Sequence, residues 1–319
     1  MNDRTKRFWS WWDRFGILAI LLAVGLVFLA LNARIVSVSN LTTVLSRSAT
    51  TGIAAAGMTF AICAGGFDLS VGSILSLVTC VVAMNIANIG MWPSILLALL
   101  VGVLCGVVNG LIITKLHIQT FVATLATQLA FKGAALVYSN GKRVLMSKNK
   151  EIKIFSTSSI FGIPVQVILV VAVFVIAYLV YRHTRFGVKT RAIGSNEAAA
   201  RASGINVDRT LIAVFVVTCL TAACAGVLQS SRLATGSAII GDGFELDVIT
   251  SVILGGTALS GGKGNIWGSF IGALLLSLIR SGLNILGVDE AFQKLAIAVV
   301  LLFALSISGI KIITQEAAK

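Results

Sequence analysis

Charged side chains are scarce in this chain. Aspartate, glutamate, lysine and arginine together make up 12% of its 319 residues, while hydrophobic residues make up 57%. A soluble globular protein carries about 25% charged residues, so the composition excludes that class and indicates an all-α polytopic membrane protein. Histidine is scarcer still, with only His117 and His183. Two histidines provide little material for a metal centre or a proton relay, so we expect no metal site.

The sequence also lacks the short motifs of common enzyme classes. None of the five cysteines stands in a C-x-x-C pair, and all lie in apolar segments, which favours small core residues over disulfides or ligands. The run Gly261-Gly-Lys-Gly264 resembles part of a nucleotide-binding P-loop, but Thr257 and Gly264 stand where that loop needs glycine and serine or threonine. No G-x-S-x-G or H-E-x-x-H pattern occurs. We therefore expect a chain that is not an enzyme and binds no cofactor itself.

The net charge of +13 would suggest a nucleic-acid partner in a soluble chain. Here the basic residues gather at the ends of apolar runs, where they orient a membrane protein. We therefore expect membrane lipid around the chain and no nucleic-acid partner.

Ten apolar runs approach the roughly 20 residues that a membrane-spanning helix needs. They lie at 15–32, 46–64, 69–89, 93–114, 118–138, 163–181, 210–230, 246–260, 264–287 and 291–310. Glycine-rich breaks separate the second run from the third and the eighth from the ninth, so glycine-broken helices are expected at both places.

Charge and aromatic residues predict the orientation. Tryptophans and arginines at 7–14 resemble an interfacial belt on the cytoplasmic side, and no A-x-A cleavage site follows the first run. Ten spans then place both termini and the polar loop 182–209 in the cytoplasm, and the loops 139–162 and 231–245 outside. Loop 139–162 is basic, against the positive-inside rule. A miscounted span or an outward basic patch that meets an acidic partner would each explain it.

The loop 182–209 is the longest polar interruption deep in the chain, and its centre predicts a short capped helix. Ser195 or Asn196 can cap the N-terminus, Glu197 lies in the first turn, and Gly204 can adopt the left-handed conformation after the end. A helix this short has little core of its own to pack on. It therefore either joins two membrane spans or provides a docking site for another molecule.

Polar residues within the apolar runs are candidates for a translocation pathway. An ionisable group at membrane depth is costly and favours a functional role, but Asp68 could instead cap the helix that follows it. Lys132 and Arg280 are expected to reach toward the interface. The other candidates either line a wet path or bond neighbouring helices. The pathway set is Asp68, Ser70, Asn109, Gln128 and Asn284.

Two glycine series at four-residue spacing predict close helix packing. G-x-x-x-G places its glycines on one helix face, where backbones can approach. The series are Gly102, Gly106, Gly110 and Gly264, Gly268, Gly272. In addition, residues 65–73 and 261–269 share the pattern G-G-x5-G-S, which favours corresponding breaks in two halves of a transport pathway, although chance explains so few identities equally well.

Several motifs together resemble a known family. Glu197-Ala198-Ala199 followed by Gly204 is similar to the E-A-A loop of ABC importer permeases, although the glycine comes one residue late and Ile-x-Leu-Pro is missing. The wider set is Gly57-Met-Thr59, Gly66-Phe-Asp-Leu-Ser-Val-Gly-Ser73, Thr184-Arg-Phe-Gly187, Gly194-Ser-Asn-Glu-Ala-Ala-Ala-Arg-Ala-Ser-Gly-Ile-Asn206, Leu254-Gly-Gly-Thr-Ala-Leu-Ser-Gly-Gly-Lys-Gly264 and Gly282-Leu-Asn-Ile-Leu-Gly287. In this order they resemble ribose-type permease subunits of bacterial sugar ABC importers, within the branched-chain amino acid/ribose permease superfamily.

That resemblance implies a type II importer-like bundle in the bacterial inner membrane. It implies a second permease copy or a paralogue, ATPase subunits that carry ATP and Mg, and a periplasmic sugar-binding protein. The domains would be a cytoplasmic interfacial segment at 1–14, a transmembrane permease domain at 15–310 and a cytoplasmic tail at 311–319. The residues expected to couple to the ATPase are Asn196, Glu197, Ala198, Ala199, Arg201 and Gly204.

The expected function is uptake of a small sugar, such as ribose, driven by the partner ATPase. Two other functions remain open on the sequence. One is an ion-coupled secondary transporter with Asp68 in the ion or substrate site. The other is a membrane scaffold that assembles partners through its glycine faces and basic loops.

Overall fold

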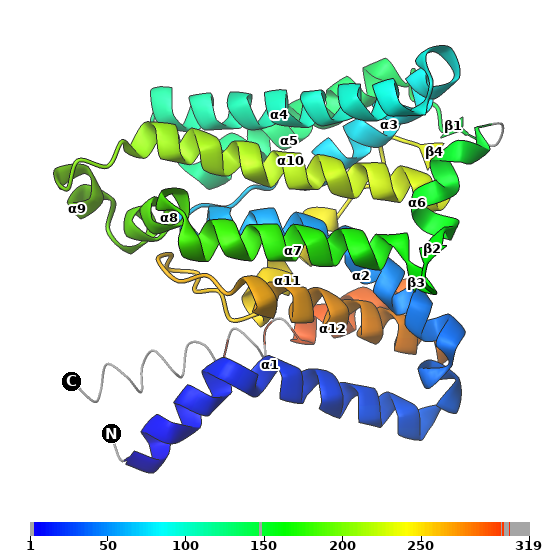
Figure 1. Ribbon diagram of the computed structural model, residues 1–319, viewed down its shortest axis with the longest axis horizontal. Helices are drawn as coiled ribbons and strands as arrows, with labels where there is room; N and C mark the ends of the chain where they lie inside the picture. The colour runs from blue at the N-terminus through cyan, green and yellow to red at the C-terminus, as the bar shows by residue number, and fades with distance from the viewer. Residues whose placement is uncertain (1–2, 147–148, 301, 303–305, 307–319) are drawn as a thin grey trace.

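The computed structural model describes residues 3–146, 149–300, 302 and 306, which form one helical bundle (Figure 1). The long helices are α1 (Asp3–Leu31), α2 (Val38–Cys63), α3 (Val71–Ile89), α4 (Met91–Lys115), α5 (Thr120–Tyr138), α7 (Val165–His183), α10 (Val207–Leu233) and α12 (Ile266–Ile285). The short ones are η1 (Ala33–Val36), η2 (Lys150–Lys153), α6 (Ile154–Thr157), α8 (Arg185–Ser195), α9 (Glu197–Ala202) and α11 (Phe244–Leu254). Within the described residues, α3, α4, α5, α7, α10 and α12 are long and apolar enough to cross a membrane. An all-α polytopic membrane protein is thus confirmed.

Helix α2 is the centre of the bundle and packs against α7, α10, α11 and α12. All residues from 52 to 63 are buried. The run Ala54-Ala-Ala-Gly57 permits this, because small side chains let neighbouring backbones approach. A Cβ on Gly57 would lie 2.0 Å from Thr221 Oγ1 and 2.9 Å from Thr218 Cα on α10. A larger residue at position 57 would therefore force α2 and α10 apart.

The two ends of the bundle carry different connections (Figure 1). Helices α8 and α9 lie at one end, together with the start of α10. At the opposite end β1 (Val144–Leu145) pairs antiparallel with β4 (Thr235–Gly236), so the segments after α5 and after α10 meet there. The hairpin of β2 (Ser159–Ile160) and β3 (Ile163–Pro164) precedes α7 at that same end. The predicted grouping of loops 139–162 and 231–245 on one side therefore agrees with the structure.

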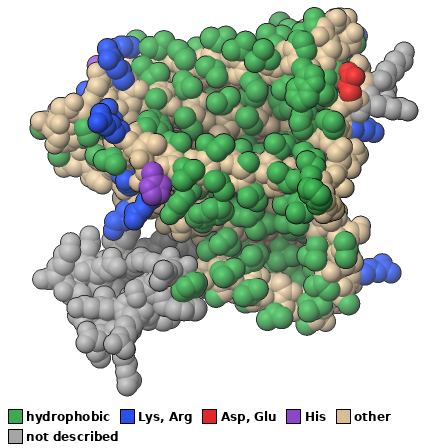
Figure 2. All heavy atoms as spheres, viewed as in Figure 1, with side chains coloured by type: hydrophobic (Ala, Val, Ile, Leu, Met, Phe, Trp, Pro, Cys, Tyr) green, Lys and Arg blue, Asp and Glu red, His purple; other side chains and the backbone are tan. Residues whose placement is uncertain are grey.

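Between these ends the surface is apolar (Figure 2). On α4 the exposed side chains include Leu96, Leu100 and Leu104, and a chain in water would not leave such a continuous apolar surface uncovered. Lysine and arginine side chains gather instead near α8 and α9 in this view. The distribution is that of a protein surrounded by lipid at its middle and by water at its ends.

One predicted span was wrong. The run 246–260 was expected to cross the membrane, but α11 ends at Leu254 after 11 residues. Gly255 and Gly256 follow, and Gly256 has a φ of +83°, which ends the helix. Eleven helical residues rise about 17 Å, too little for a bilayer crossing. The chain continues as an irregular loop as far as α12.

The remaining predicted boundaries, of the first segment, the last span and the tail, lie near the two ends of the chain. Helix α1 runs from Asp3 through residue 15 without a break, so residues 3–14 and the first predicted span share one helix. Residues 290–300 are helical and match the start of the span predicted over 291–310. Most of the remainder of that span, and the tail 311–319, lie outside the described residues.

Candidate functional site

Helix α9 is the short capped helix that the sequence predicts. Asn196, with extended backbone, accepts a hydrogen bond on Oδ1 from the Ala199 N–H at 2.9 Å, so the N-cap prediction is confirmed for Asn196. Gly204 has a φ of +80° and donates its N–H to Arg201 O, while Ile205 donates to Ala200 O. These bonds satisfy the last carbonyls of α9.

An ion-pair network orders the surface of α9. Arg201 donates to Glu197 Oε1 at 2.9 Å and to Asp208 Oδ1 at 3.2 Å. The hydrogen bond to Glu197, followed by that to Asp208, raises the pKa of Arg201 above its ordinary value. The arginine therefore stays charged at any physiological pH, and it ties α9 to the first turn of α10.

One face of α9 is buried and the other is free. Ala200 packs with Ile193 of α8 and Val207 of α10 in a small apolar cluster, which holds the helix in place. The remaining residues from 196 to 199, including Glu197, Ala198 and Ala199, are exposed. A short helix on a rigid base, with its other face open, is suited to dock into a groove on another protein.

Beneath α9, the end of α8 contacts two other segments backbone to backbone. A Cβ on Gly194 would lie 1.8 Å from Cys63 O, at the end of α2, and 2.6 Å from Gly262 N. Gly262 itself donates its N–H to Cys63 O at 2.8 Å, and a Cβ on Gly261 would lie 2.6 Å from Gly194 O. No side chain separates these three segments, so the α8–α9 unit cannot move without moving the end of α2 and the loop before α12. We call this meeting point, made by Cys63, Gly194, Gly261 and Gly262, the glycine joint.

Tyr181 and Arg191 reinforce the glycine joint. Arg191 Nη1 donates to Tyr181 O at 2.5 Å, and its guanidinium lies 4.8 Å from the centre of the Tyr181 ring. The Tyr181 hydroxyl accepts a hydrogen bond from the Gly264 N–H at 2.7 Å. Sequence reasoning missed both residues. The only local signal was Gly187 in the Thr184–Gly187 motif, where a Cβ would lie 2.1 Å from Tyr181 O.

The pathway candidate Asp68 lies in a buried polar cluster instead of capping α3. Its Oδ1 accepts from the Ser70 N–H at 2.9 Å and from Ser70 Oγ at 2.5 Å. The bond two residues along the chain forms an Asx-type turn, and Ser70 occupies the N-cap position of α3. The N-cap prediction for Asp68 was therefore wrong: two residues separate the carboxyl group from the helix.

Helices α4 and α10 complete this cluster. Asn109 Nδ2 donates to Ser70 Oγ at 2.8 Å, and Cys219 Sγ donates to Asp68 Oδ2 at 3.3 Å. Asp68, Ser70 and Asn109 are each fully buried, and Asn109 Oδ1 has no hydrogen-bond partner among the described residues. The cluster joins three pathway candidates and fixes the break between α2 and α3 against α4 and α10.

Gln128 lies apart from the Asp68 cluster, beside acidic residues at the start of α11. Its Nε2 donates to Glu245 Oε1 at 3.1 Å. One turn along α5, Lys132 forms an ion pair with Asp242 at 2.7 Å. Glu245 is buried, and within the described part of the chain its Oε2 lacks a hydrogen-bond partner. A Cβ on Gly72 would lie 2.3 Å from that oxygen, so the glycine of the 66–73 motif makes room for the carboxylate.

Asn284, the last pathway candidate, and Arg280, a charged residue within an apolar run, contact other parts of the bundle. Asn284, near the end of α12, accepts from Gln293 Nε2 at 3.4 Å. Arg280 pairs with Asp247 of α11 at 2.5 Å. The five pathway candidates therefore fall into three places, and the structure brings together only Asp68, Ser70 and Asn109.

The glycine series differ in what they contact. Gly102, Gly106 and Gly110 all face α10, where an added Cβ would lie 2.4 Å from Ala223, 2.6 Å from Val216 and 2.7 Å from Ile212. In the second series Gly268 and Gly272 face the backbone of Gly255 and Ser251 at the end of α11.

Gly264 does not share a helix face with Gly268 and Gly272, so that expectation was wrong. Gly264 precedes α12, which begins at Ile266. Asn265 caps the helix by accepting from the Gly268 N–H, so only Gly268 and Gly272 of the series lie within α12.

The family described as branched-chain amino acid transport system / permease component matches residues 40–305. The chain belongs to this permease family. The match extends from the third residue of α2 to beyond the end of α12 and includes the glycine joint and α9. It confirms the family resemblance that the sequence motifs indicate.

Curated relatives agree over nearly the whole permease. The chain is 38% identical over 303 residues to the ribose import permease protein RbsC of Escherichia coli (strain K12), which covers 94% of both chains. It is 40% identical over 276 residues to RbsC of Bacillus subtilis (strain 168), 86% of both chains. It is also 36% identical over 298 residues to the L-arabinose transport system permease protein AraH of Escherichia coli (strain K12), 92% of this chain and 89% of that one. No solved structure matches the chain significantly.

Proposed function

We propose that this permease is the membrane subunit of a bacterial ABC importer that carries ribose or a similar monosaccharide into the cytoplasm. The observation that carries the proposal is α9, a short exposed helix whose base is joined through glycines to the centre of the bundle. The names of relatives that align over nearly the whole chain support the sugar substrate. The sequence offers no P-loop for ATP, so in this proposal the energy comes from ATP that another chain binds.

In this proposal α9 is the coupling helix. Its exposed face, with Asn196, Glu197, Ala198, Ala199, Arg201 and Gly204, seats on an ATPase subunit that holds ATP and Mg. Closure of the ATPases displaces α8 and α9 together, because the shared cluster of Ala200, Ile193 and Val207 binds them into one unit. The glycine joint then passes the displacement to the ends of α2 and of the loop before α12.

The sugar pathway is proposed to pass Gln128 and Glu245. A sugar without charge is held by hydrogen bonds to its hydroxyls, and Glu245 Oε2 is an acceptor with no partner among the described residues. A pathway through Asp68, Ser70 and Asn109 requires the break to open, since all three are fully buried here. Asn284 would lie at the far end of α12 from the glycine joint.

The partners follow from the two ends of the molecule. The α9 end faces the cytoplasm, with both termini on that side, and the opposite end faces the periplasm. There the basic residues Lys142, Arg143 and Lys153 are proposed to meet the acidic rim of a sugar-binding protein. A second copy of the permease, or a paralogue, completes the transporter in the inner membrane.

Transport by the reconstituted complex tests this function. Proteoliposomes that contain the permease, its ATPase and its binding protein are expected to accumulate labelled ribose or another monosaccharide only when ATP is supplied. Glu197→Ala is expected to lower uptake while the permease remains folded. Uptake by the permease alone, driven by a proton or sodium gradient and lost in Asp68→Asn, would instead establish a secondary transporter.

A further inference from the structure

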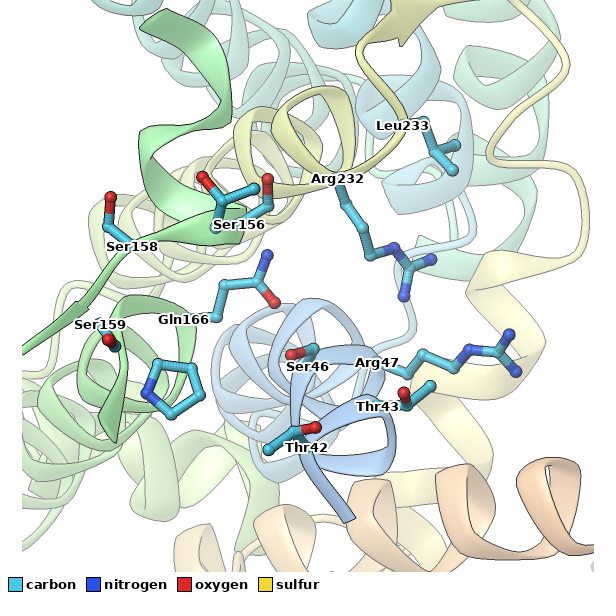
Figure 3. Close-up of a pocket in the computed structure, with 12 residues that line it drawn as sticks. Thr42, Thr43, Ser46, Arg47, Ser156, Ser158, Ser159, Gln166, Arg232 and Leu233 are labelled. Carbon is cyan, nitrogen blue, oxygen red and sulfur yellow. The ribbon is translucent and has the colours of Figure 1, made fainter. Parts of the chain in front are cut away.

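A basic cavity lies at the end of the bundle opposite α9, between α2, α6, α7 and α10 (Figure 3). Its volume is about 540 Å³. Figure 3 shows Gln166 and Arg232 extending into this space from different helices, with Arg47 along its edge. Hydroxyl groups of Thr42, Ser46 and several other serines and threonines complete the wall. The cavity is separate from α9 and from the Gln128–Glu245 pair.

The charge of this cavity is not balanced. Its lining contains two arginines and neither aspartate nor glutamate. Arg47 and Arg232 also border an adjoining cavity that is lined by Asp242 and Asp247, but Asp247 is paired with Arg280 and Asp242 with Lys132. Among the described residues, no ion pair is formed by Arg47 or Arg232. Two guanidinium groups without a counter-charge favour an anionic ligand, above all a phosphate or a carboxylate.

Gln166 indicates a second property of the ligand, a hydrogen-bond donor. It is 2% exposed, and its Oε1 has no hydrogen-bond partner within the described part of the chain. Leaving a buried acceptor unpaired is costly, so a ligand that fits here should carry a donor as well as a negative charge. An ionised carboxylate only accepts hydrogen bonds, whereas a phosphate that bears a glycerol group has hydroxyls to donate.

The rim of the cavity is apolar. Ser159 and Pro164 of the wall are joined by the hairpin tip, where Ile160, Phe161 and Ile163 are exposed and Phe161 is fully so. Leu41, next to Thr42 of the wall, is exposed as well. Apolar side chains at the water end of a membrane protein contact acyl chains or the interface.

We propose that this cavity binds the glycerophosphate headgroup of an anionic phospholipid, with the phosphate between Arg47 and Arg232 and a glycerol hydroxyl on Gln166 Oε1. The hairpin tip at 160–163 lies against the acyl chains. The site ties the outer ends of α2, α7 and α10 to the lipid leaflet.

Native mass spectrometry of the delipidated permease in detergent tests the site. Defined amounts of phosphatidylglycerol or phosphatidylcholine are added, and the bound fraction is measured. The permease is expected to retain phosphatidylglycerol, and the double variant Arg47→Gln/Arg232→Gln is expected to bind it about tenfold or more weakly. Gln166→Leu should reduce the preference for phosphatidylglycerol over phosphatidic acid, which lacks the headgroup glycerol. Lys142→Gln, exposed at the same end but outside the cavity, should bind as the wild type.

Three results would overturn the proposal. Equal retention of both lipids by the wild type would exclude a headgroup site. Binding of free glycerol phosphate that phosphatidylglycerol does not displace would identify a soluble anion as the ligand. Loss of binding-protein association in the arginine variants, with lipid retention unchanged, would identify a protein carboxylate. Thermal unfolding of each variant in phosphatidylcholine, expected at the wild-type temperature, separates loss of the site from loss of the fold.

Discussion

Gly194→Ala is the most direct test of the proposed coupling route. The new Cβ would lie 1.8 Å from Cys63 O and 2.6 Å from Gly262 N, whereas carbon and oxygen in close contact stand at roughly 3.3–3.6 Å. The end of α8 must therefore move away from α2 by about 1.5 Å. Both obstructing atoms belong to the backbone, so no side-chain rotation relieves the clash.

The expected cost can be estimated from the contacts. Overpacking costs about 1–3 kcal/mol, and loss of the Gly262 N–H bond to Cys63 O adds about 0.5–1.5 kcal/mol. The variant should thus lose roughly 1.5–4.5 kcal/mol of stability, seen as a lower unfolding temperature. Because the displaced segment carries α9, uptake should fall about tenfold or more, while ATP hydrolysis by the bound ATPase continues.

Proteoliposomes allow both quantities to be measured on one preparation. Sugar uptake and phosphate release are recorded together, and their ratio reports coupling. Gly133→Ala is the matched control: Gly133 lies within α5 with nothing within 4 Å of an added Cβ, so the change should leave the ratio unaltered. A Gly194→Ala variant with the wild-type ratio would show that the glycine joint does not transmit the displacement.

Three further changes test other parts of the permease. Asp68→Ala should lower the free energy of unfolding by about 1–3 kcal/mol, because it leaves buried donors of Ser70 and Cys219 without their acceptor; unchanged melting would show that the cluster does not hold the helix break. Arg201→Ala removes only exposed ion pairs, so the unfolding temperature should stay close to that of the wild type. Because the pKa of Arg201 is raised, wild-type coupling should not vary with pH between about 6 and 9 through this residue. Glu245→Gln should raise the KM for sugar uptake if Glu245 lines the pathway, and an unchanged KM would remove it from the pathway.

Local features were the most predictable part of the molecule. The cap of α9 and its terminating glycine depend on residues a few positions apart, so Asn196 and Gly204 could be placed from the sequence. The apolar runs likewise predicted the long helices. The prediction of a span at 246–260 was wrong because hydropathy does not show where a helix ends, and two glycines end α11 at Leu254.

The site could be predicted only in part, because its decisive contacts join distant segments. Gly194 contacts Cys63, 131 positions before it, and Gly262, 68 positions after it. Spacing in the sequence does not reveal such long-range contacts. Asp68 was selected for its charge, but its partners Asn109 and Cys219 come from α4 and α10. A single sequence thus identifies the residue types at a site more readily than their partners.

The pairing of β1 with β4 constrains the order in which the chain can assemble. Val144 lies opposite Gly236, and the Met146 N–H bonds to Ala234 O, so two turns that are distant in the sequence form one ribbon. During synthesis β1 therefore stays unpaired until the chain from α7 to the end of α10 has been made. The ribbon therefore closes late, and a nascent chain that ends before Thr235 has no means of closing it.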